Sequence, residues 1–573
     1  MELPGEISRE IRKASIKNAA NYGKARESTV LNAILSKFPN MRSEIKRLSI
    51  EVNSEVKRVN GLSVEQLASE AEEYADEFKE EKKEKTEKTA KPKMVLEGAL
   101  AGAFTTRFPP EPNGYMHIGH AKAAFMEKEF SSIYGGKINL YFDDTNPEVE
   151  KQEYVDAFKK DLQWLGISFD AEYYASDNIE QMYFYASVLI EKEKAYVCDC
   201  SPETMKENRS GGTDCKHKGL TSSENLSRWK EMLSGNLAEA VLRYKGAIND
   251  QNTAMRDPTL FRIKAHEHYR QGRKYVVWPT YDFNTPIMDS LNGITDVLRS
   301  KEYELRDQLY YEILGALGLR TPRIYSFARL EINDNITSKR KLKELINKNK
   351  LWGFDDPRLV TIAGLRRRGV LPQAIRSFVL RFGMSKTDSK VSLDMLLAEN
   401  RKLIDGISAR LFFIKDPVEI TVKGIPDSLR KIEIKSHPSE NLGHRKYNLS
   451  DTFFINAYDA FNLKDGDTIR FKDAFGIKID KAGNKAIEAS YISECDDEVP
   501  KIPWVNKGNC LKATALEMGK LLIGDEFNEE SMLAVEGFTE SKALDIEEGS
   551  AVQFERMGFF KFDQKEKMVF IGI

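Results

Sequence analysis

Arg107-Phe-Pro-Pro-Glu-Pro-Asn-Gly-Tyr-Met-His-Ile-Gly-His120 is the stretch that decides how the middle of this chain folds. Residues 105–108 predict a short strand, the prolines and glycine of 109–114 end it, and the run from Ala121 favours a helix. The two histidines of the stretch are therefore expected at a helix N-terminus. Unpaired backbone N–H groups and the positive end of the helix dipole favour an anion there, such as the phosphates of a nucleotide. The alternative is that the histidines only cap and pack the helix.

Composition excludes several classes of protein. No apolar run approaches the roughly 20 residues of a membrane span, and the N-terminus lacks the apolar core of a signal peptide. A formal net charge of -2 limits contacts with nucleic acid to local basic surfaces. Five cysteines, an odd number, argue against a disulfide framework and leave reduced thiols or a metal site. We therefore expect a cytoplasmic protein that has no membrane partner.

The length of the chain and the changes in its pattern of helix-forming and strand-forming segments predict a multidomain protein. A chain of 573 residues is too long for one hydrophobic core. We predict an N-terminal helical module (1–78), a charged linker (79–97), an α/β domain (98–325) with an insertion at about 200–272, a helical stem region (326–408) and an all-β region of barrels (409–573). The linker has almost nothing large and apolar to bury, so it predicts a tether, with a solvated helix as the alternative.

The α/β prediction depends on the alternation of strands and helices. Strands at 105–108 and 137–142 alternate with helices from Ala121 and over 152–165, which predicts a parallel sheet with ligands beyond the carboxyl ends of its strands. A polar segment interrupts the alternation, and the strand signal resumes at Tyr275. The barrels are predicted from short strands between Gly and Asp turns, at 418–422, 431–435, 468–471 and 568–571.

The stretch 107–120 resembles the first signature of class I aminoacyl-tRNA synthetases, in the long form typical of glutamyl and glutaminyl enzymes. The resemblance implies a Rossmann-like catalytic domain that binds ATP, with Mg²⁺ as the usual partner of the phosphates. It implies catalytic roles for His117 and His120. The ATP contacts that it implies are Pro110, Glu111, Pro112, Asn113, Gly114, Tyr115, Met116, His117, Ile118, Gly119 and His120.

Residues 336–341, Ile-Thr-Ser-Lys-Arg-Lys, form the second catalytic candidate. Alone, a basic run of this kind is usually the solvated start of a helix. It resembles the second class I signature, although Ile336 replaces the first lysine of the generic motif. The resemblance implies that Ser338 and Lys339 are catalytic and that Lys339 also binds ATP. A mobile lysine stabilises the charge that builds on the phosphates while a carboxylate attacks the α-phosphorus.

Further segments extend the resemblance in the order expected for the family. Residues 142–147, Phe-Asp-Asp-Thr-Asn-Pro, match a block in which the first aspartate, here Asp143, holds the amino group of the amino acid. Tyr141 stands where many members carry arginine. Residues 254–258, Ala-Met-Arg-Asp-Pro, resemble the block that leads toward the acceptor end of tRNA. The segment 278–299 resembles the wall of the amino-acid pocket, which implies a substrate contact for Tyr281.

Arg299 discriminates between the two amino acids of this family. A buried guanidinium pairs with a γ-carboxylate, whereas a neutral carboxamide would leave its charge unpaired. Glutamate is therefore favoured over glutamine. Glutamyl members carry arginine at this point and glutaminyl members an uncharged residue, and Arg107, common to both groups, is implied as a second anchor.

Cys198, Cys200, Cys215 and His217 form two candidate metal-binding pairs inside the insertion. Three thiolates and an imidazole suit tetrahedral Zn²⁺, and four protein ligands would make the site structural. Incidental free cysteines are the alternative. Some glutamyl enzymes carry zinc at this region.

The β-rich end points to the archaeal type, since bacterial glutamyl enzymes have a helical anticodon-binding region. The resemblance thus implies a glutamyl enzyme that uses ATP to activate L-glutamate and transfers it to tRNA(Glu). A glutaminyl enzyme and a non-catalytic tRNA-binding paralogue are the alternatives. The sequence does not decide whether tRNA(Gln) is also charged with glutamate or whether the N-terminal module binds protein partners.

Overall fold

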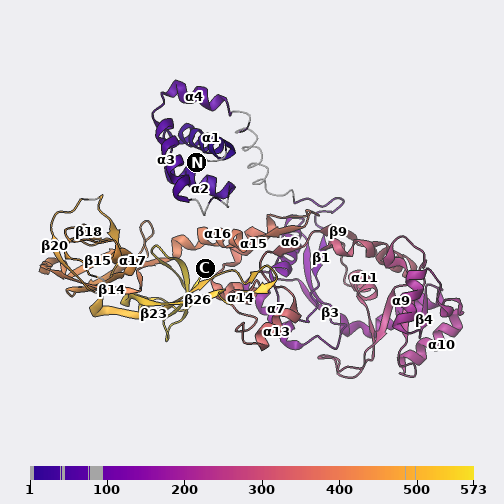
Figure 1. Cartoon of the computed structure of the whole chain (residues 1–573). Coiled ribbons are helices and arrows are strands. Elements are labelled where there is room, and N and C mark those ends of the chain that lie inside the picture. The colour runs from indigo at the N-terminus through magenta and orange to yellow at the C-terminus, as the bar shows by residue number, and fades with distance from the viewer. Residues whose placement is uncertain are drawn as a thin grey trace. The chain divides into compact units, whose positions relative to one another are not determined.

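The computed structural model describes residues 5–38, 41, 45–74, 77, 94–483, 486–496 and 498–573 (Figure 1). The chain forms two compact units, Met1–Lys91 and Pro92–Ile573. Most of the predicted linker 79–97 lies outside the described residues, because only its last four residues are described. Among the described helices, none combines the length and the apolar character that crossing a bilayer requires.

The first unit is helical, as the periodicity of its sequence predicts. Its helices are α1 (Gly5–Tyr22), α2 (Glu27–Lys37), α3 (Ile45–Asn60) and α4 (Val64–Glu72). Ile11, Ile16, Leu48 and Val52 are buried in one core that these helices share. The Ser63 side chain accepts the N–H of Gln66 and starts α4 with a capping box.

A parallel sheet organises the beginning of the second unit. Its order is β1-β2-β3, and each pair is parallel. The bounds are β1 (Thr105–Phe108), α6 (Ile118–Ile133), β2 (Lys137–Phe142), α7 (Gln152–Trp164) and β3 (Ala171–Tyr174). Both predicted strands are confirmed, while the helix expected from Ala121 begins three residues earlier. The parallel pair β8 (Asp296–Ser300) and β9 (Arg323–Phe327) forms a separate two-stranded sheet next to β1, where the N–H of Thr295 donates to Thr105 O at 2.8 Å.

The interrupting segment builds its own antiparallel sheet and core. The sheet has the order β4-β5-β6-β7. The elements are α8 (Ile179–Glu191), β4 (Ala195–Cys198), α9 (Pro202–Gly211), α10 (Ser222–Leu233), β5 (Val241–Tyr244), β6 (Thr259–Ile263) and β7 (Val277–Pro279). The strand expected at Tyr275 begins at Val277 and pairs antiparallel with β6. It therefore belongs to this second sheet, and the expectation that it resumes the parallel alternation is wrong.

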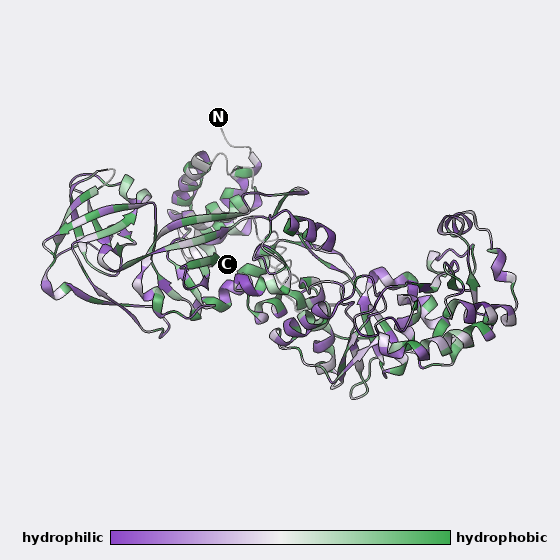
Figure 2. Ribbon diagram, turned by 90° about the horizontal axis from the view of Figure 1, so that it is seen from below, coloured by the Kyte–Doolittle hydropathy of each residue, from purple (hydrophilic) through white to green (hydrophobic). Residues whose placement is uncertain are grey.

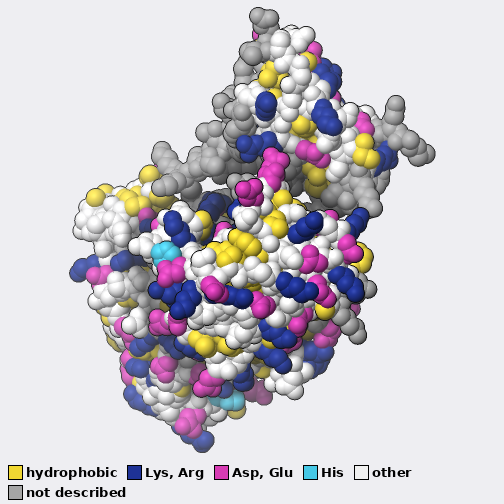
Figure 3. Space-filling view, turned by 90° about the vertical axis from the view of Figure 1, so that its left-hand side faces the viewer, with side chains coloured by type: hydrophobic (Ala, Val, Ile, Leu, Met, Phe, Trp, Pro, Cys, Tyr) yellow, Lys and Arg dark blue, Asp and Glu magenta, His cyan; other side chains and the backbone are white. Residues whose placement is uncertain are grey.

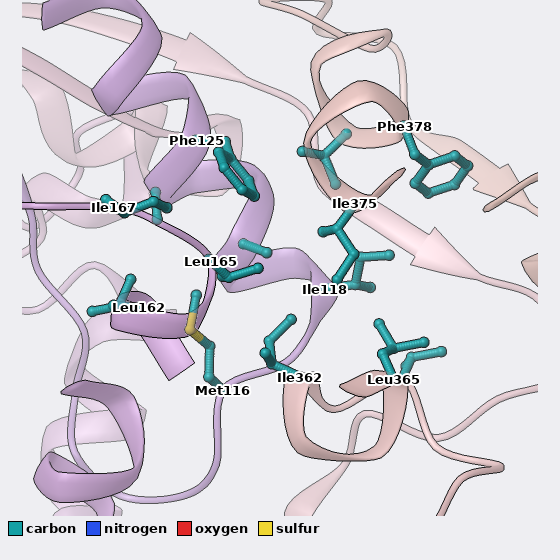
Figure 4. Close-up of a cluster of buried hydrophobic side chains, with 14 of the residues drawn as sticks. Met116, Ile118, Phe125, Leu162, Leu165, Ile167, Ile362, Leu365, Ile375 and Phe378 are labelled. Carbon is teal, nitrogen blue, oxygen red and sulfur yellow. The ribbon is translucent and has the colours of Figure 1, made fainter. Parts of the chain in front are cut away.

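Helices of the predicted stem pack against the first signature. Helices α11 (Tyr281–Leu291) and α12 (Asp307–Leu317) precede the stem and belong to the predicted α/β domain. The stem elements are β10 (Leu330–Ile332), α13 (Lys339–Asn347), α14 (Ile362–Arg368), α15 (Pro372–Leu380), β11 (Ser389–Val391) and α16 (Leu393–Ile404). Met116 and Ile118 meet Ile362 and Ile375 in one buried cluster (Figure 4). Backbone hydrogen bonds join the same segments, from the N–H of Ile118 to Val360 O at 3.0 Å and from that of Ile362 to Met116 O at 2.9 Å. The start of α6 is thus fixed to the stem.

The C-terminal region is all-β, as predicted, and consists mainly of two seven-stranded sheets. The chain enters one sheet, forms the other and then returns to the first. The first sheet contains β12 (Ala409–Leu411), β13 (Phe413–Lys415), β23 (Cys510–Met518), β26 (Met532–Glu540), β27 (Ala551–Phe554), β28 (Gly558–Gln564) and β29 (Val569–Gly572). The second contains β14 (Pro417–Lys423), β17 (Thr452–Asn456), β18 (Thr468–Phe471), β19 (Gly476–Lys481), β20 (Ala486–Ile492), β21 (Lys501–Ile502) and β22 (Val505–Asn506). Two hairpins accompany them, β15 (Lys431–Lys435) with β16 (His444–Asn448) and β24 (Leu522–Ile523) with β25 (Glu526–Phe527).

Strands of both sheets alternate more buried with more exposed residues, as β14, β18 and β27 do, and hydrophobic and hydrophilic residues both occur along their ribbons (Figure 2). Trp504, Phe453 and Phe471 are buried in the core of one sheet, and Phe554 and Phe570 in that of the other. On the face of the molecule shown in Figure 3, Lys and Arg side chains are interspersed with Asp and Glu. This mixture agrees with the net charge of -2.

Candidate active site

Both histidines of the first signature are half-buried, and their pKa values lie below the usual range of histidine. His117 is the N-cap of α6, and its Nδ1 accepts the N–H of Gly119 at 3.1 Å. His120 Nδ1 accepts the N–H of His117 at 3.2 Å, and the two rings lie 3.9 Å apart. Burial lowers the pKa of His117 to about 4 and that of His120 well below its usual range. Because each Nδ1 is an acceptor, each neutral ring carries its proton on Nε2 and can donate it to a ligand.

Lys339 brings the second signature to the first. It is the first residue of α13, and its side chain lies across Gly114, where a Cβ on residue 114 would come within 2.5 Å of Lys339 Cε. Burial lowers the pKa of the Lys339 ammonium, which also lowers the pKa of the neighbouring histidines. Ser338 is the N-cap of α13 but makes no capping hydrogen bond through its side chain. The structure therefore gathers His117, His120 and Lys339 at one point.

A cavity of about 1450 Å³ extends from these residues to the predicted amino-acid pocket. Its wall includes most of the side chains predicted from the sequence, namely Arg107, Pro110, Glu111, Asn113, His117, Gly119, His120, Asp143, Tyr281, Arg299 and Lys339. The predicted residues that lie off the wall are Pro112, Gly114, Tyr115, Met116, Ile118 and Ser338. Met116 and Ile118 are core residues, and Tyr115 stacks on Phe354 with 4.3 Å between ring centroids. Thr337, rather than Ser338, lines the cavity.

Arg299 lies at the far end of the cavity and is 5% exposed. Its Nη1 donates to the hydroxyl of Tyr281 at 3.3 Å, and its Nη2 donates to Asp307. Its Nε has no hydrogen-bond partner among the described residues. The ring of Tyr303 packs on that of Tyr281, with 4.6 Å between centroids. A buried guanidinium that keeps an unpartnered N–H is suited to bind an additional acceptor.

Arg107 is buried and already held by protein groups. Its Nε and Nη2 donate to the carboxylate of Asp289 at 2.7 and 3.2 Å, and its Nη1 donates to Leu298 O at 3.2 Å. The hydroxyl of Tyr310 donates to the same carboxylate at 3.0 Å. The side chain lies in the cavity wall, but a substrate would share its guanidinium with Asp289. No local sequence pattern links Arg107 to an aspartate 182 residues away, and sequence reasoning missed this partner.

Asp143, the predicted ammonium contact, lies in the wall of the cavity. Its Oδ1 accepts hydrogen bonds from Asn284 Nδ2 at 2.6 Å and from the hydroxyl of Thr145 at 3.3 Å. Burial raises the pKa of Asp143 to about 7, helped by repulsion from Glu111 and Asp144.

Glu150, which sequence reasoning missed, also lines the cavity, and burial raises its pKa to about 10. Glu150 is therefore a neutral acid near neutral pH, and a bound ammonium would find its anion at Asp143.

The block 254–258 contributes to the wall of the same cavity. Ala254 and Pro258 belong to the wall, together with Arg209 from α9. Asp257 is buried at a positive φ of 44° and does not face the cavity. Its carboxylate accepts the hydroxyl of Tyr196 at 3.0 Å and the N–H of Gly246 at 2.9 Å. This aspartate therefore orders the loop whose neighbours form the wall.

The four predicted metal ligands come together as one cluster. Cys198, Cys200, Cys215 and His217 each offer one ligand atom, and all four atoms lie within 4.8 Å of one another. His217 presents Nδ1 to the thiols, at 3.4 Å from the sulfur of Cys215. Its Nε2 lies 2.7 Å from a carboxylate oxygen of Asp199. A carboxylate that orients a ligating imidazole from behind is typical of zinc sites, and the donor set fits Zn²⁺.

A second cavity, of about 720 Å³, lies in the β-rich region and is rich in cations. Arg410 from β12 and Arg445 from β16 each keep a buried N–H without a partner among the described residues, at Nη1 and Nε respectively. Arg445 Nη1 donates to the buried carboxylate of Glu540 at 2.7 Å. Unpartnered guanidinium donors in a cavity favour a ligand with acceptor oxygens.

Comparison with known families and proteins agrees with this geometry. Residues 103–405 match the catalytic domain of class I tRNA synthetases (E and Q), and residues 408–495 and 501–563 match two anti-codon binding domains of the same class. The chain is 39% identical over 569 residues to the glutamate–tRNA ligase of Nitrosopumilus maritimus, covering 99% of both chains. It is 38% identical over 568 residues to that of Cenarchaeum symbiosum, again covering 99% of both, and 38% identical over 578 residues to that of Pyrococcus abyssi, covering 98% of both. The chain belongs to the class I tRNA synthetases of the glutamyl and glutaminyl family.

Proposed function

We propose that this chain is a glutamate–tRNA ligase, which forms glutamyl-adenylate from ATP and L-glutamate and then transfers the glutamyl group to tRNA(Glu). The observation that carries the proposal is Arg299, a buried guanidinium with an unpartnered Nε at the end of the cavity that His117 and Lys339 also line. Relatives that match over 98–99% of the chain bear this name, which supports the same assignment.

The activation step needs no nucleophile from the protein. An oxygen of the glutamate α-carboxylate forms a bond to the α-phosphorus of ATP, and the bond from that phosphorus to the pyrophosphate oxygen breaks. Negative charge grows on the phosphates during this exchange. The ammonium of Lys339 and the Nε2–H groups of His117 and His120, which line the same cavity, would stabilise this charge.

The transfer step uses the same cavity. A hydroxyl of the 3′-terminal ribose attacks the carbonyl carbon of the adenylate and the ester bond forms. The bond from that carbon to the phosphate oxygen breaks, AMP leaves with its electron pair, and the hydroxyl proton passes to a phosphate oxygen of the leaving AMP. The wall near Ala254, Pro258 and Arg209 is the part that would receive the acceptor end. Asp143 would hold the substrate ammonium through both steps, and Tyr281 and Arg299 would hold the γ-carboxylate.

Metal ions would act at two separate places. Apart from the Cys198 cluster, the described residues contain no group of three or more His, Cys, Asp or Glu side chains close enough to share an ion. Mg²⁺ would therefore be held by the phosphates of ATP, whose charge it would reduce. Zn²⁺ would be held by Cys198, Cys200, Cys215 and His217, would keep no open coordination position and would stabilise the insertion.

The β-rich region would read the tRNA. Its second cavity offers unpartnered guanidinium N–H groups to base or phosphate oxygens, and the matched domains are of the anti-codon binding kind. Whether tRNA(Gln) is charged as well depends on one anticodon base. Protein partners of the N-terminal module, action in the cytoplasm and the domain boundaries are predictions from the sequence.

The experiment that tests the function compares wild type with Arg299→Ala and Arg299→Lys. Glutamate-dependent exchange of pyrophosphate into ATP, with tRNA present, is expected in wild type and should fall at least a hundredfold in Arg299→Ala, because a buried carboxylate loses its charge-assisted partner. Arg299→Lys keeps the charge but not the planar donor geometry, so its exchange rate should lie between those of wild type and Arg299→Ala. Exchange that is unchanged in Arg299→Ala would overturn the assignment of the pocket. Exchange driven by glutamine would favour the glutaminyl alternative, and the absence of exchange with either amino acid would favour the non-catalytic paralogue.

A further inference from the structure

Two exposed aromatic side chains stand on a single helical turn of the β-rich region. Helix α17 (Ala457–Phe461) follows β17 and carries Tyr458 and Phe461, which are 80% and 85% exposed. They are the most exposed of the large hydrophobic side chains in the described ranges. Residues three apart lie on the same side of a helix, so the two rings share one outward face. Isolated exposed hydrophobics are ordinary, but two rings together on so short a helix form a platform.

The inward side of α17 is firmly anchored. Ala460 is buried in the core of the second sheet, and the N–H of Ala457 donates to Asp416 O at 3.0 Å. Asn462 Nδ2 donates to Tyr458 O at 2.7 Å and closes the end of the turn. These contacts hold the backbone under the rings. A ligand that covers the two rings would therefore meet a surface that is already ordered, which lowers the entropic cost of binding.

One ion pair connects this platform to the second cavity. Asp459 lies between the two aromatic residues in the sequence, and its Oδ1 accepts Arg556 Nη1 at 2.9 Å. Arg556 is itself part of the cavity wall, where its Nη2 donates to Lys501 O. The helix that carries the platform is thus joined by one ion pair to a residue of the cavity wall.

The free hydrogen-bond donors of the cavity indicate what the platform binds. Its wall carries five cationic side chains, Arg410, Lys435, Arg445, Lys472 and Arg556, and three acidic ones, Glu433, Asp473 and Glu555. Four of the cations are ion-paired, with Asp405, Glu540, Glu555 and Asp459, but Arg410 Nη1 and Arg445 Nε keep buried N–H groups without a partner among the described residues. Free guanidinium donors near exposed aromatic rings suit unpaired nucleotides, because acceptor oxygens meet the donors while bases stack on the rings. The match of this region to anti-codon binding domains favours tRNA over a protein partner.

We propose that Tyr458 and Phe461 form a stacking platform for an unpaired nucleotide of the tRNA, next to the nucleotide whose acceptor oxygens enter the second cavity. The platform would add affinity for the loop without selecting a particular base, since every base has a π-face. Selection would be left to the hydrogen-bond donors of the cavity. This inference rests on the proposed function in one respect, that the ligand is tRNA.

The test uses the full-length chain and a tRNA(Glu) transcript. Tyr458→Ala with Phe461→Ala should raise the dissociation constant of the transcript about tenfold or more, as expected for one stacked base. Tyr458→Phe and Phe461→Tyr keep the rings and should bind like wild type. Ile50→Ala, which removes another exposed apolar side chain in the first unit, is the matched control and should leave binding unchanged.

Two further measurements separate stacking from other roles. Affinity for the transcript should fall equally steeply with salt concentration in the double variant and in wild type. In Arg556→Ala it should fall less steeply, because one cation is lost. A 2-aminopurine placed in the anticodon loop should be quenched on binding to wild type and less quenched on binding to the double variant. Equal affinity and equal quenching in wild type and double variant would overturn the platform while leaving the ligase intact. If wild type itself fails to bind the transcript, the proposed function fails instead.

Discussion

Lys339 lies directly across Gly114, so that the second signature touches the turn of the first at a position where only glycine leaves room. A Cβ on residue 114 would lie 2.5 Å from Lys339 Cε and 2.8 Å from its Cδ. The atoms in the way belong to the flexible end of a side chain, which can move aside at little cost in stability. Moving it displaces the one ammonium that we assign to the phosphates.

Gly114→Ala should therefore impair catalysis without unfolding the protein. We expect adenylate formation to slow by about 10²–10³-fold, the usual effect of removing one preorganised stabilising group, with an unchanged melting temperature. Gly315→Ala is the matched control, because residue 315 lies in α12 with open space around the new Cβ. Single-turnover adenylate formation and thermal unfolding measure the two effects. A Gly114→Ala enzyme as fast as the control would show that Lys339 acts from elsewhere.

The pH dependence of glutamate binding should reflect Asp143. Burial raises the pKa of this carboxyl to about 7. Above that pH it is ionised and can pair with the substrate ammonium, and below it the pairing is lost. The KM for glutamate should consequently rise as the pH falls below about 7, approaching tenfold per pH unit for one proton. Asp143→Asn should have a high KM and lose this dependence. A KM that stays constant from about pH 8 to about pH 6 in wild type would contradict the assignment.

Arg107 and Arg299 should differ in what their removal does to folding. Both the Arg107 and the Asp289 side chains are 1% exposed, so Arg107→Ala leaves a buried carboxylate without its cation and should cost about 3–5 kcal/mol of stability. Arg299 has a partner, Asp307, that is 32% exposed, and water can replace the lost cation there. Arg299→Ala should therefore lower the melting temperature much less while abolishing glutamate activation. Equal melting temperatures in the two variants would show that Asp289 finds another partner.

The cysteine cluster should hold one metal ion that is needed for structure rather than for chemistry. The chain purified without chelators should contain about one Zn²⁺ per molecule, by elemental analysis. Cys215→Ser should lose the ion and lower the melting temperature, and chelators should do the same to wild type. Cys510→Ser, a free cysteine outside the cluster, should keep the ion. Metal content that is the same in both variants would rule out the cluster as the site.

Those features that depend on residues that locally end or begin an element could be predicted from the sequence. The ends of β1 and β2 were predictable because prolines, glycines and strand-forming runs mark them. The first turn of α6 was not, because a histidine is not among the preferred N-cap residues. The strand near Tyr275 was assigned to the wrong sheet, since a short apolar run has the same pattern in parallel and antiparallel sheets.

Candidate site residues were predictable where a motif carries them, and their partners were not. His117, His120, Lys339 and Arg299 line one cavity, as the resemblance implied. Asp289 and Asp307, which hold the two arginines, have no motif of their own and come near them only in the folded chain. Glu150 was missed for a related reason, because its raised pKa arises from burial that a sequence does not display.

The most direct test of the central claim is the charging of purified tRNA(Glu) by the wild-type chain, with labelled glutamate and labelled glutamine offered separately together with ATP and Mg²⁺. We predict that glutamate is esterified to the tRNA at enzyme-catalysed rates and that glutamine is not, because the carboxamide leaves the Arg299 charge unpaired. Esterification of glutamine in preference to glutamate, or of neither amino acid, would contradict it.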